Sequence, residues 1–196
     1  MIHQTAKVSP KAKIGKNVQI WALSTIREEA KIGDDCIVGN NVYIDHHVKI
    51  GSKVKIQNNA LIYYGSTIED DVFIGPAVCL TNDKYPRATS SQGQLKKKQD
   101  WTLKKIIVKK GASIGAGSII LPGVKLGLYC MVGAGSVVTK DIADHALVFG
   151  NPAQVNGYVC RLGHLLKHKV LEYSSSITYL CKRCNKKYKI FHEKKS

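Results

Sequence analysis

The sequence predicts an all-β solenoid, a triangular prism of short parallel strands, because it carries a six-residue repeat. Aliphatic residues occupy every sixth position through the first half of the chain. Small or β-branched residues follow four positions later, where a narrow prism leaves little room. A period of six matches neither an α-helix nor a two-faced strand. Each unit is therefore expected to give one short strand and one corner, with three units completing a coil of about eighteen residues.

The first block of the repeat covers the chain up to residue 80. Its aliphatic positions are Val8, Ile14, Ile20, Ile26, Ile32, Val38, Ile44, Ile50, Ile56, Ile62, Ile68, Ile74 and Leu80. Glycine often follows the aliphatic residue, as in Ile14-Gly15, and we expect it to supply backbone freedom for the turn. Polar pairs such as Asp34-Asp35 and Asn40-Asn41 suit the corners, because Asn and Asp tolerate turn geometry.

Residues 83–107 depart from the repeat and form an insertion with a lysine-rich run that reaches Trp101. Long structureless insertions in compact domains are usually functional or disordered. A functional loop is therefore expected here, and a solvated loop without a role is the alternative.

A column of polar corner residues ends where this insertion leaves the prism. Residues eighteen apart should stack at the strand spacing of about 4.8 Å. One stack would contain Glu28, His46, Tyr64 and Asn82, and a second beside it Glu29, His47, Gly65 and Asp83. Carboxylates, imidazoles, a phenol and an amide then share one groove, which suits a polar ligand. Solvated corners without a role are the alternative.

The repeat resumes after the insertion. Its second block has aliphatic positions Val108, Ile114, Ile120, Leu126, Val132 and Val138, with inward partners Ala112, Ser118, Val124, Cys130, Ser136 and Ile142. The same spacing puts Ala116-Gly117, Ala134-Gly135 and Pro152-Ala153 in one column of minimal side chains. Such bare corners would let a thin ligand lie against the backbone, unless the small residues only satisfy packing.

We divide the chain into a solenoid domain, residues 1–157, and a basic tail, residues 158–196. The tail contains Cys181-Lys182-Arg183-Cys184, whose C-x₂-C spacing is that of a zinc knuckle. Cys160 and His164 precede it and complete a candidate set of four metal ligands. A degenerate knuckle that binds no metal is the alternative.

The formal net charge is +16. Such a chain attracts polyanions, which include nucleic acid and phosphorylated small molecules, although lysines also keep an oligomer soluble. No apolar stretch is long enough to span a membrane, and the first residues lack the pattern of a signal peptide. We expect a cytoplasmic protein with reduced cysteines and without membrane insertion.

Two segments are more specific than the repeat: Glu69-Asp70-Asp71-Val72-Phe73-Ile74-Gly75-Pro76 and Leu80-Thr81-Asn82-Asp83-Lys84-Tyr85-Pro86-Arg87. Both resemble the hexapeptide-repeat N-acetyltransferases that acetylate the 3-amino group of nucleotide-linked sugars. The closest resemblance is to the UDP-2-acetamido-3-amino-2,3-dideoxyglucuronate N-acetyltransferases of surface-polysaccharide (lipopolysaccharide O-antigen) pathways. The related dTDP-3-amino-3,6-dideoxyhexose N-acetyltransferases share these stretches and remain an alternative.

The resemblance implies a left-handed parallel β-helix that forms homotrimers, with acetyl-CoA as acyl donor and catalytic sites in the clefts between neighbouring prisms. It implies that Asn82 contacts the reacting amine. The implied substrate-binding residues are Glu28, His46, Gln57, Asn58, Tyr64, Asp83, Lys84, Tyr85 and Arg87. The implied acetyl-CoA-binding residues are Ala116, Gly117, Ala134, Gly135, Lys140 and Pro152. In the tail of related enzymes, two cysteines are separated by one residue. In this chain the first is Cys160, but Leu162 occupies the position of the second. His164 would then replace the missing cysteine as a metal ligand.

An amine acceptor is consistent with the residues around Asn82. O-acetylating relatives place a histidine base in this stretch, since a hydroxyl must lose its proton during attack, and this chain has none between Asn82 and Tyr85. A sugar amine with a pKa of roughly 8 is partly neutral without a base. The enzyme would then mainly position the amine and stabilise the oxyanion. A base role for His46 or His47, acting through water, is the alternative.

Two other classes of function fit the sequence less well. A non-enzymatic module could bind polyanions through the basic tail, but it does not explain the match around Asn82, and we expect no nucleic-acid partner. Carbonic-anhydrase-like relatives need three zinc-binding histidines, and that spacing is absent from the sequence.

Overall fold

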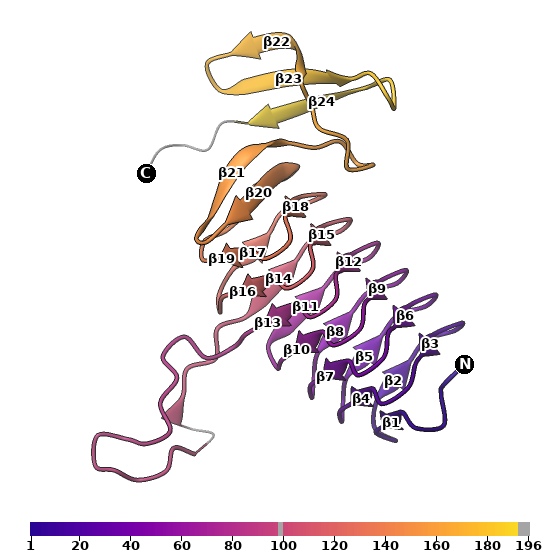
Figure 1. Ribbon diagram of the computed structural model, residues 1–196, viewed down its shortest axis with the longest axis vertical. Coiled ribbons are helices and arrows are strands. Elements are labelled where there is room, and N and C mark those ends of the chain that lie inside the picture. Colours follow the sequence, from indigo (N-terminus) through magenta and orange to yellow (C-terminus); the bar gives the residue numbers. More distant parts are fainter. Residues whose placement is uncertain (98–99, 192–196) are drawn as a thin grey trace.

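A computed structural model describes residues 1–97 and 100–191. Figure 1 shows a stack of triangular coils that runs from the N-terminus to a small separate sheet near the C-terminus, with one long loop projecting from the side of the stack. Lys98 and Gln99, in the lysine-rich loop, and residues 192–196, at the end of the basic tail, lie outside the described residues.

The described coils build three sheets, one on each side of the prism, in which strands of successive coils pair in parallel (Figure 1). The first sheet consists of β1 (Lys7–Val8), β4 (Thr25–Ile26), β7 (Tyr43–Ile44), β10 (Leu61–Ile62), β13 (Cys79–Leu80), β16 (Ile119–Ile120) and β19 (Val137–Val138). The second consists of β2 (Lys13–Ile14), β5 (Lys31–Ile32), β8 (Lys49–Ile50), β11 (Ser66–Ile68), β14 (Ile106–Val108) and β17 (Lys125–Leu126). The third consists of β3 (Gln19–Ile20), β6 (Ile37–Val38), β9 (Lys55–Ile56), β12 (Phe73–Ile74), β15 (Ser113–Ile114), β18 (Met131–Val132), β20 (Ala146–Gly150) and β21 (Ala153–Tyr158).

The strand register confirms the predicted coil length. Ile26 pairs with Ile44, and Ile44 pairs with Ile62, so equivalent residues lie eighteen positions apart. The repeated aliphatic side chains from Ile20 to Val138 are buried, and so are their small partners from Val18 to Ser136. They form one continuous hydrophobic core along the axis of the prism.

The glycines that follow the aliphatic positions have a different role from the one predicted. Their φ angles are not in the left-handed region. Positive φ occurs instead at the second residue of the polar pairs, for example 58° at Asp35 and 52° at Asn41. A Cβ on Gly115 would lie 2.5 Å from the backbone nitrogen of Ala134 in the next coil. These glycines are therefore required because successive coils approach closely, and not because the turn needs an unusual φ.

Gly115→Ala is expected to lower the free energy of unfolding by about 3 kcal/mol, because the new methyl group meets backbone that can move only by separating two coils. Gly117, in the same corner, is the matched control. Its φ is +66° and a Cβ there would meet nothing within 4 Å, so Gly117→Ala should cost only about 1 kcal/mol of backbone strain. Urea unfolding at one protein concentration measures both. Equal losses of unfolding free energy in the two variants would contradict the explanation that Gly115 is required because successive coils approach closely.

The last coil is two residues shorter than predicted. Leu126 pairs with Ile142 and Met131 with Leu147, sixteen positions apart, because the corner around Lys140 is shortened. Ile142 therefore occupies a large aliphatic position and not the small partner position assigned from the repeat. Pro152 is likewise shifted out of its predicted column. It lies in the turn between β20 and β21, where the chain reverses to pair antiparallel.

The insertion runs between β13 and β14, so β14 begins at Ile106, slightly earlier than the repeat indicated. The loop is pinned at its base, where Asp83 bridges to Leu103. Further out, Tyr85 and Leu95 are 71% and 76% exposed. The loop projects away from the prism (Figure 1) and leaves apolar side chains in solvent, which favours contact with another surface.

The described tail forms an antiparallel sheet of β22 (His168–Tyr173), β23 (Ser176–Cys181) and β24 (Lys186–Phe191). It has its own small core, which includes Cys160, Leu166 and Tyr179. The tail sheet meets the last coil through the rings of His145 and Tyr188, whose centroids lie 5.2 Å apart. Within residues 1–97 and 100–191 no helix has the length and hydropathy needed to cross a membrane.

Candidate functional site

The predicted column of polar corner residues is present at the corner between the first and second sheets. The rings of His46 and Tyr64 are stacked with centroids 4.4 Å apart and planes 16° apart. Asn82 donates from its side-chain Nδ2 to the carbonyl of Tyr64 at 3.3 Å. Glu28 lies one coil below His46, and its main-chain carbonyl accepts from the amide of His47. The structure thus brings Glu28, His46, Tyr64 and Asn82 together in sequence order along one edge.

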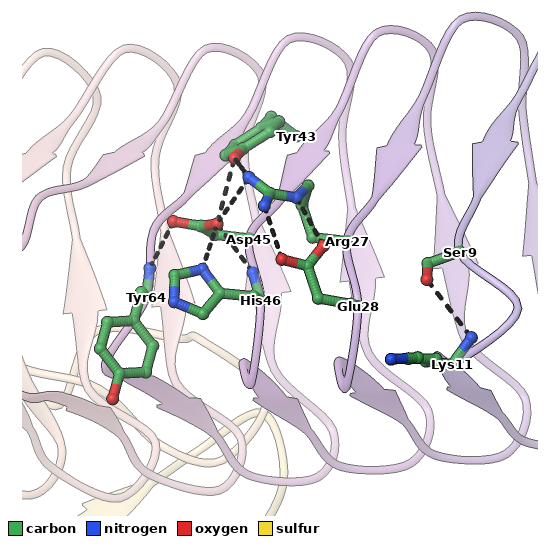
Figure 2. Close-up of polar contacts among 8 residues, drawn as sticks. All are labelled: Ser9, Lys11, Arg27, Glu28, Tyr43, Asp45, His46 and Tyr64. Carbon is green, nitrogen blue, oxygen red and sulfur yellow. Dashed lines mark hydrogen bonds and ion pairs between the residues drawn. The ribbon is translucent and has the colours of Figure 1, made fainter.

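A buried carboxylate, Asp45, organises this column and was missed by the sequence analysis. Asp45 is 8% exposed, and its Oδ1 lies 2.8 Å from both the main-chain amide and the ring Nδ1 of His46. Its Oδ2 accepts from the amide of Tyr64 at 3.2 Å, and its Oδ1 also accepts from the hydroxyl of Tyr43 at 3.1 Å. Figure 2 shows Asp45 at the centre of this network. Asp45 therefore orients the His46 ring.

Ionisation in the network follows from these contacts. Burial raises the pKa of the Asp45 carboxyl, but hydrogen bonds from His46, Tyr64 and Tyr43 outweigh burial and hold this pKa below its ordinary value. Arg27 donates two hydrogen bonds to Glu28, at 2.6 and 2.7 Å. Those bonds lower the pKa of Glu28 to about 2. Both carboxylates are therefore charged near neutral pH, and Glu28 is unsuited to accept a proton there.

Asn82 is fixed at the point where the chain leaves the prism. Its neighbour Thr81 donates from Oγ1 to the carbonyl of Ile120 at 2.8 Å. The carbonyl of Asn82 accepts from the amide of Lys104, where the loop returns. The side chain of Leu103 covers Gly65, since a Cβ on that glycine would lie 2.7 Å from Leu103 Cδ1. The half-buried Asn82 amide is thus held between the corner column and both ends of the loop.

A basic pocket opens beside Asn82 at the base of the loop. It is lined by Asn82, Asp83, Arg87, Lys96, Lys97 and Trp101. The sequence analysis did not assign the two lysines or the tryptophan to a site. Among the predicted substrate-binding residues, Lys84 and Tyr85 lie further out on the loop, where the Lys84 ammonium is 5.7 Å from the Tyr85 ring centroid. Several cations around one pocket suit an anionic ligand such as a diphosphate.

Gln57 and Asn58 do not join this cluster within one chain. They follow β9 and lie at the corner between the third and first sheets, one side of the prism away from His46. Asn58 accepts from the amide of Asn40 through its Oδ1 at 2.8 Å and so links two coils. The predicted substrate-binding residues therefore divide between two corners.

The same corner as Gln57 carries the bare residues assigned to acetyl-CoA. The amide of Gly135 donates to the carbonyl of Ala116 at 2.8 Å, so the Ala116-Gly117 and Ala134-Gly135 corners are stacked as predicted. A Cβ on Gly117 or Gly135 would meet nothing within 4 Å, and the surface there is open. Lys140 is exposed in the shortened corner of the last coil.

The predicted metal ligands come together in the tail. The sulfurs of Cys160, Cys181 and Cys184 all lie within 4.8 Å of one another. The Nδ1 atom of His164 is 3.5 Å from the Cys160 sulfur and 4.0 Å from that of Cys181. The side chain of Leu162 is exposed, and its main-chain amide donates to the Cys160 sulfur at 3.3 Å.

Comparison with protein families matches two models. The model "Bacterial transferase hexapeptide (six repeats)" matches residues 11–46. The model "Hexapeptide repeat of succinyl-transferase" matches residues 30–64 and 105–140. Together with the triangular coils, these matches confirm the predicted hexapeptide-repeat β-helix.

The chain is similar in sequence to curated acetyltransferases, among them a sugar N-acetyltransferase and a galactoside O-acetyltransferase. The dTDP-3-amino-3,6-dideoxy-α-D-galactopyranose 3-N-acetyltransferase of Aneurinibacillus thermoaerophilus is 64% identical over 61 residues, which are 31% of this chain and 32% of that protein. A galactoside O-acetyltransferase of Lactococcus lactis is 30% identical over 135 residues, which are 64% of this chain and 61% of that protein. The chain thus spans less than two thirds of the length of either relative.

The solved structure of PerB from Caulobacter crescentus, in complex with CoA and GDP-perosamine, is also similar. It is 27% identical with a TM-score of 0.50, and the match covers 80% of this chain and 56% of that chain. A nucleotide-linked sugar and CoA are thus bound by a protein whose fold resembles this one.

Proposed function

Because the chain carries the hexapeptide repeat of bacterial transferases, we propose that it is an acetyl-CoA-dependent N-acetyltransferase for the 3-amino group of a nucleotide-linked sugar. The observation that carries the proposal is the half-buried Asn82 amide between the His46 column and the basic pocket at the loop base. The 64% identity with a sugar 3-N-acetyltransferase, over 61 residues, supports the same reaction.

In the proposed reaction the sugar amine attacks the thioester carbonyl of acetyl-CoA. A nitrogen–carbon bond forms, the carbon–sulfur bond breaks, and CoA leaves as a thiolate that takes up a proton. Asn82 holds the amine in line with the carbonyl, and backbone N–H groups hold the developing oxyanion. Positioning and preorganised donors of this kind supply much of the rate enhancement in acyl transfer.

The Asp45–His46 pair favours the alternative in which an enzyme base assists. Asp45 accepts from Nδ1 of His46, which leaves the second ring nitrogen free to take a proton. Figure 2 shows that this second nitrogen lies farther from Asp45. His47, the other candidate, is exposed, and within residues 1–97 and 100–191 no carboxylate is hydrogen-bonded to its ring. We therefore infer that His46 accepts the proton that the amine loses, either directly or through one water.

The division of the candidate residues between two corners supports a site built from two copies of the chain. One substrate can contact His46 and Gln57 together only if a neighbouring prism presents its own Gln57 corner. Closed rings bring such non-equivalent surfaces together, which fits the homotrimer expected from the resemblance. The projecting loop and its exposed Tyr85 are then placed to cover the neighbour. Mixed oligomers of two defective variants test this arrangement.

Two nucleotide-linked sugars are the candidate substrates. A UDP-2-acetamido-3-amino-2,3-dideoxyglucuronate substrate is favoured by the Gln57-Asn58-Asn59 run and by the cysteine-bearing tail. A dTDP-3-amino-3,6-dideoxyhexose substrate is favoured by the matching A. thermoaerophilus enzyme. Either product is a building block for a surface polysaccharide.

The experiment is a CoA-release assay with acetyl-CoA and a panel of UDP- and dTDP-linked 3-amino sugars, with the 3-hydroxy sugars as controls. Turnover of a 3-amino sugar, with little turnover of its hydroxyl analogue, is the expected result. Absence of turnover with every amino sugar would refute the proposed reaction. Salt-sensitive binding of nucleic acid without turnover would instead favour the polyanion-binding alternative.

A further inference from the structure

The tail holds three thiols and an imidazole in a cluster that the proposed acetyl transfer does not use. Cys160 and His164 come from the turn before β22, Cys181 is the last residue of β23, and Cys184 lies in the turn between β23 and β24. Cys160 and Cys181 are buried, whereas Cys184 and His164 are half-buried. Two separate turns therefore point their polarisable ligand atoms at one place.

We propose that these four residues form a structural zinc site of the Cys₃His type. Zn–S bonds of about 2.3 Å and a Zn–N bond of about 2.0 Å in a tetrahedron require sulfur–sulfur distances of about 3.8 Å and sulfur–nitrogen distances of about 3.5 Å. The three sulfurs lie within 4.8 Å of one another, and His164 Nδ1 is 3.5 and 4.0 Å from two of them. His164 is not part of the group whose ligand atoms all lie within 4.8 Å of one another, so closing the tetrahedron requires its ring to move toward the Cys184 sulfur.

The backbone of the first turn supports a metal-bound thiolate. The amides of Leu162 and His164 both donate to the Cys160 sulfur, at 3.3 and 3.4 Å. The turn itself closes through Gly163, whose φ is +80° and whose amide donates to the carbonyl of Cys160 at 2.9 Å. This arrangement satisfies the thiolate with backbone donors and leaves its remaining lone pair for the metal.

The surrounding charge also fits. One Zn²⁺ with three thiolates and a neutral imidazole carries a net charge of −1, and partners of opposite sign stabilise it. Arg183 and Lys182 follow Cys181 directly and line one pocket with Cys181 and His164. Part of the basic character of the tail is thereby explained without a nucleic-acid partner.

The ligand set and the location of the zinc site indicate a structural role for the metal. All four ligands come from protein, which closes the coordination sphere and leaves no position for a substrate. The tail core is only a few side chains deep, and cores of this size usually need a disulfide or a metal. The metal joins the turn that leaves the prism to the β23–β24 turn. It therefore holds the tail sheet against the His145 ring on the last coil.

Metal content of the full-length protein, purified without chelator and under reducing conditions, tests the proposal. About one zinc per chain is expected. Chelator-treated protein should take up Co²⁺ with the absorption of a tetrahedral thiolate complex. Zinc far below one per chain, together with no cobalt uptake, would overturn the proposal.

Variants assign the ligands. Cys184→Ser and His164→Ala should each lose most of the zinc, whereas Cys79→Ser, which removes a cysteine in the prism, should keep it. Leu162→Cys should restore tetrahedral binding to the His164→Ala protein, because it adds a thiol within the same turn. An unchanged cobalt spectrum in His164→Ala would exclude His164 as a ligand. Because the site is separate from the Asn82 column, this result is independent of the proposed acetyl transfer.

Discussion

Asn82→Ala is expected to lower kcat/KM for the nucleotide-linked amino sugar about 100-fold or more, because the reacting amine loses the group that fixes its direction of attack. The fold should survive, since the Asn82 side chain makes one long hydrogen bond to the Tyr64 carbonyl. Steady-state CoA release measures the effect, and circular dichroism confirms the folded prism. Asn156→Ala removes an exposed asparagine on β21 and serves as the matched control, with activity expected within about two-fold of the wild type. Equal activity of the Asn82 and Asn156 variants would exclude a catalytic role for Asn82.

The same variant tests whether a site is shared between two chains. Gln57→Ala should also be defective, because Gln57 lies on the other candidate corner. Co-expression of the two single variants should recover roughly a quarter of the sites, since each mixed trimer combines an intact Asn82 corner with an intact Gln57 corner. A site confined to one chain would show no recovery. Sedimentation of the mixed protein establishes the oligomeric state in the same sample.

The prism could be predicted from the repeat, because each six-residue unit has one inward position that an aliphatic side chain must fill. Stacking at eighteen residues correctly placed His46, Tyr64 and Asn82 together, because that argument needs only the period. The same arithmetic was wrong for Ile142 and Pro152, where a corner shortened by two residues changes the period. No residue type marks such a shortening, so it could not be recognised from spacing alone.

Asp45 shows what a repeat cannot reveal. It follows Ile44 directly, where a glycine follows many other aliphatic residues, and it reads in sequence as an ordinary polar corner. Its importance arises from burial and from contacts contributed by the two neighbouring coils, the guanidinium of Arg27 and the main-chain amide of Tyr64. A carboxylate adjacent to a histidine at a corner next to the insertion was the available signal. The basic pocket at the loop base was missed for a similar reason, because Lys96 and Trp101 meet Asn82 only after the loop folds back.

His46→Asn is expected to lower kcat about 100-fold with KM changed only a few-fold, because the amine then has no acceptor for its proton. Asp45→Asn should lower kcat at least about 10-fold, because an amide can stabilise the wrong tautomer of the imidazole. The amide oxygen can still accept from the backbone of Tyr64, so the corner should remain folded.

His47→Asn changes the same residue type one position away, on an exposed corner, and should retain nearly full activity. The three variants distinguish the two mechanisms left open by the chemistry of an amine nucleophile. If His46→Asn and His47→Asn are equally active while Asn82→Ala is not, the amine reacts in its neutral form without an enzyme base, and Asp45 only stabilises the corner. If both His46→Asn and Asp45→Asn lose activity, the buried carboxylate of Asp45 sets the tautomer of a catalytic histidine. The column of residues below Asn82 then takes part in the reaction as well as in substrate binding.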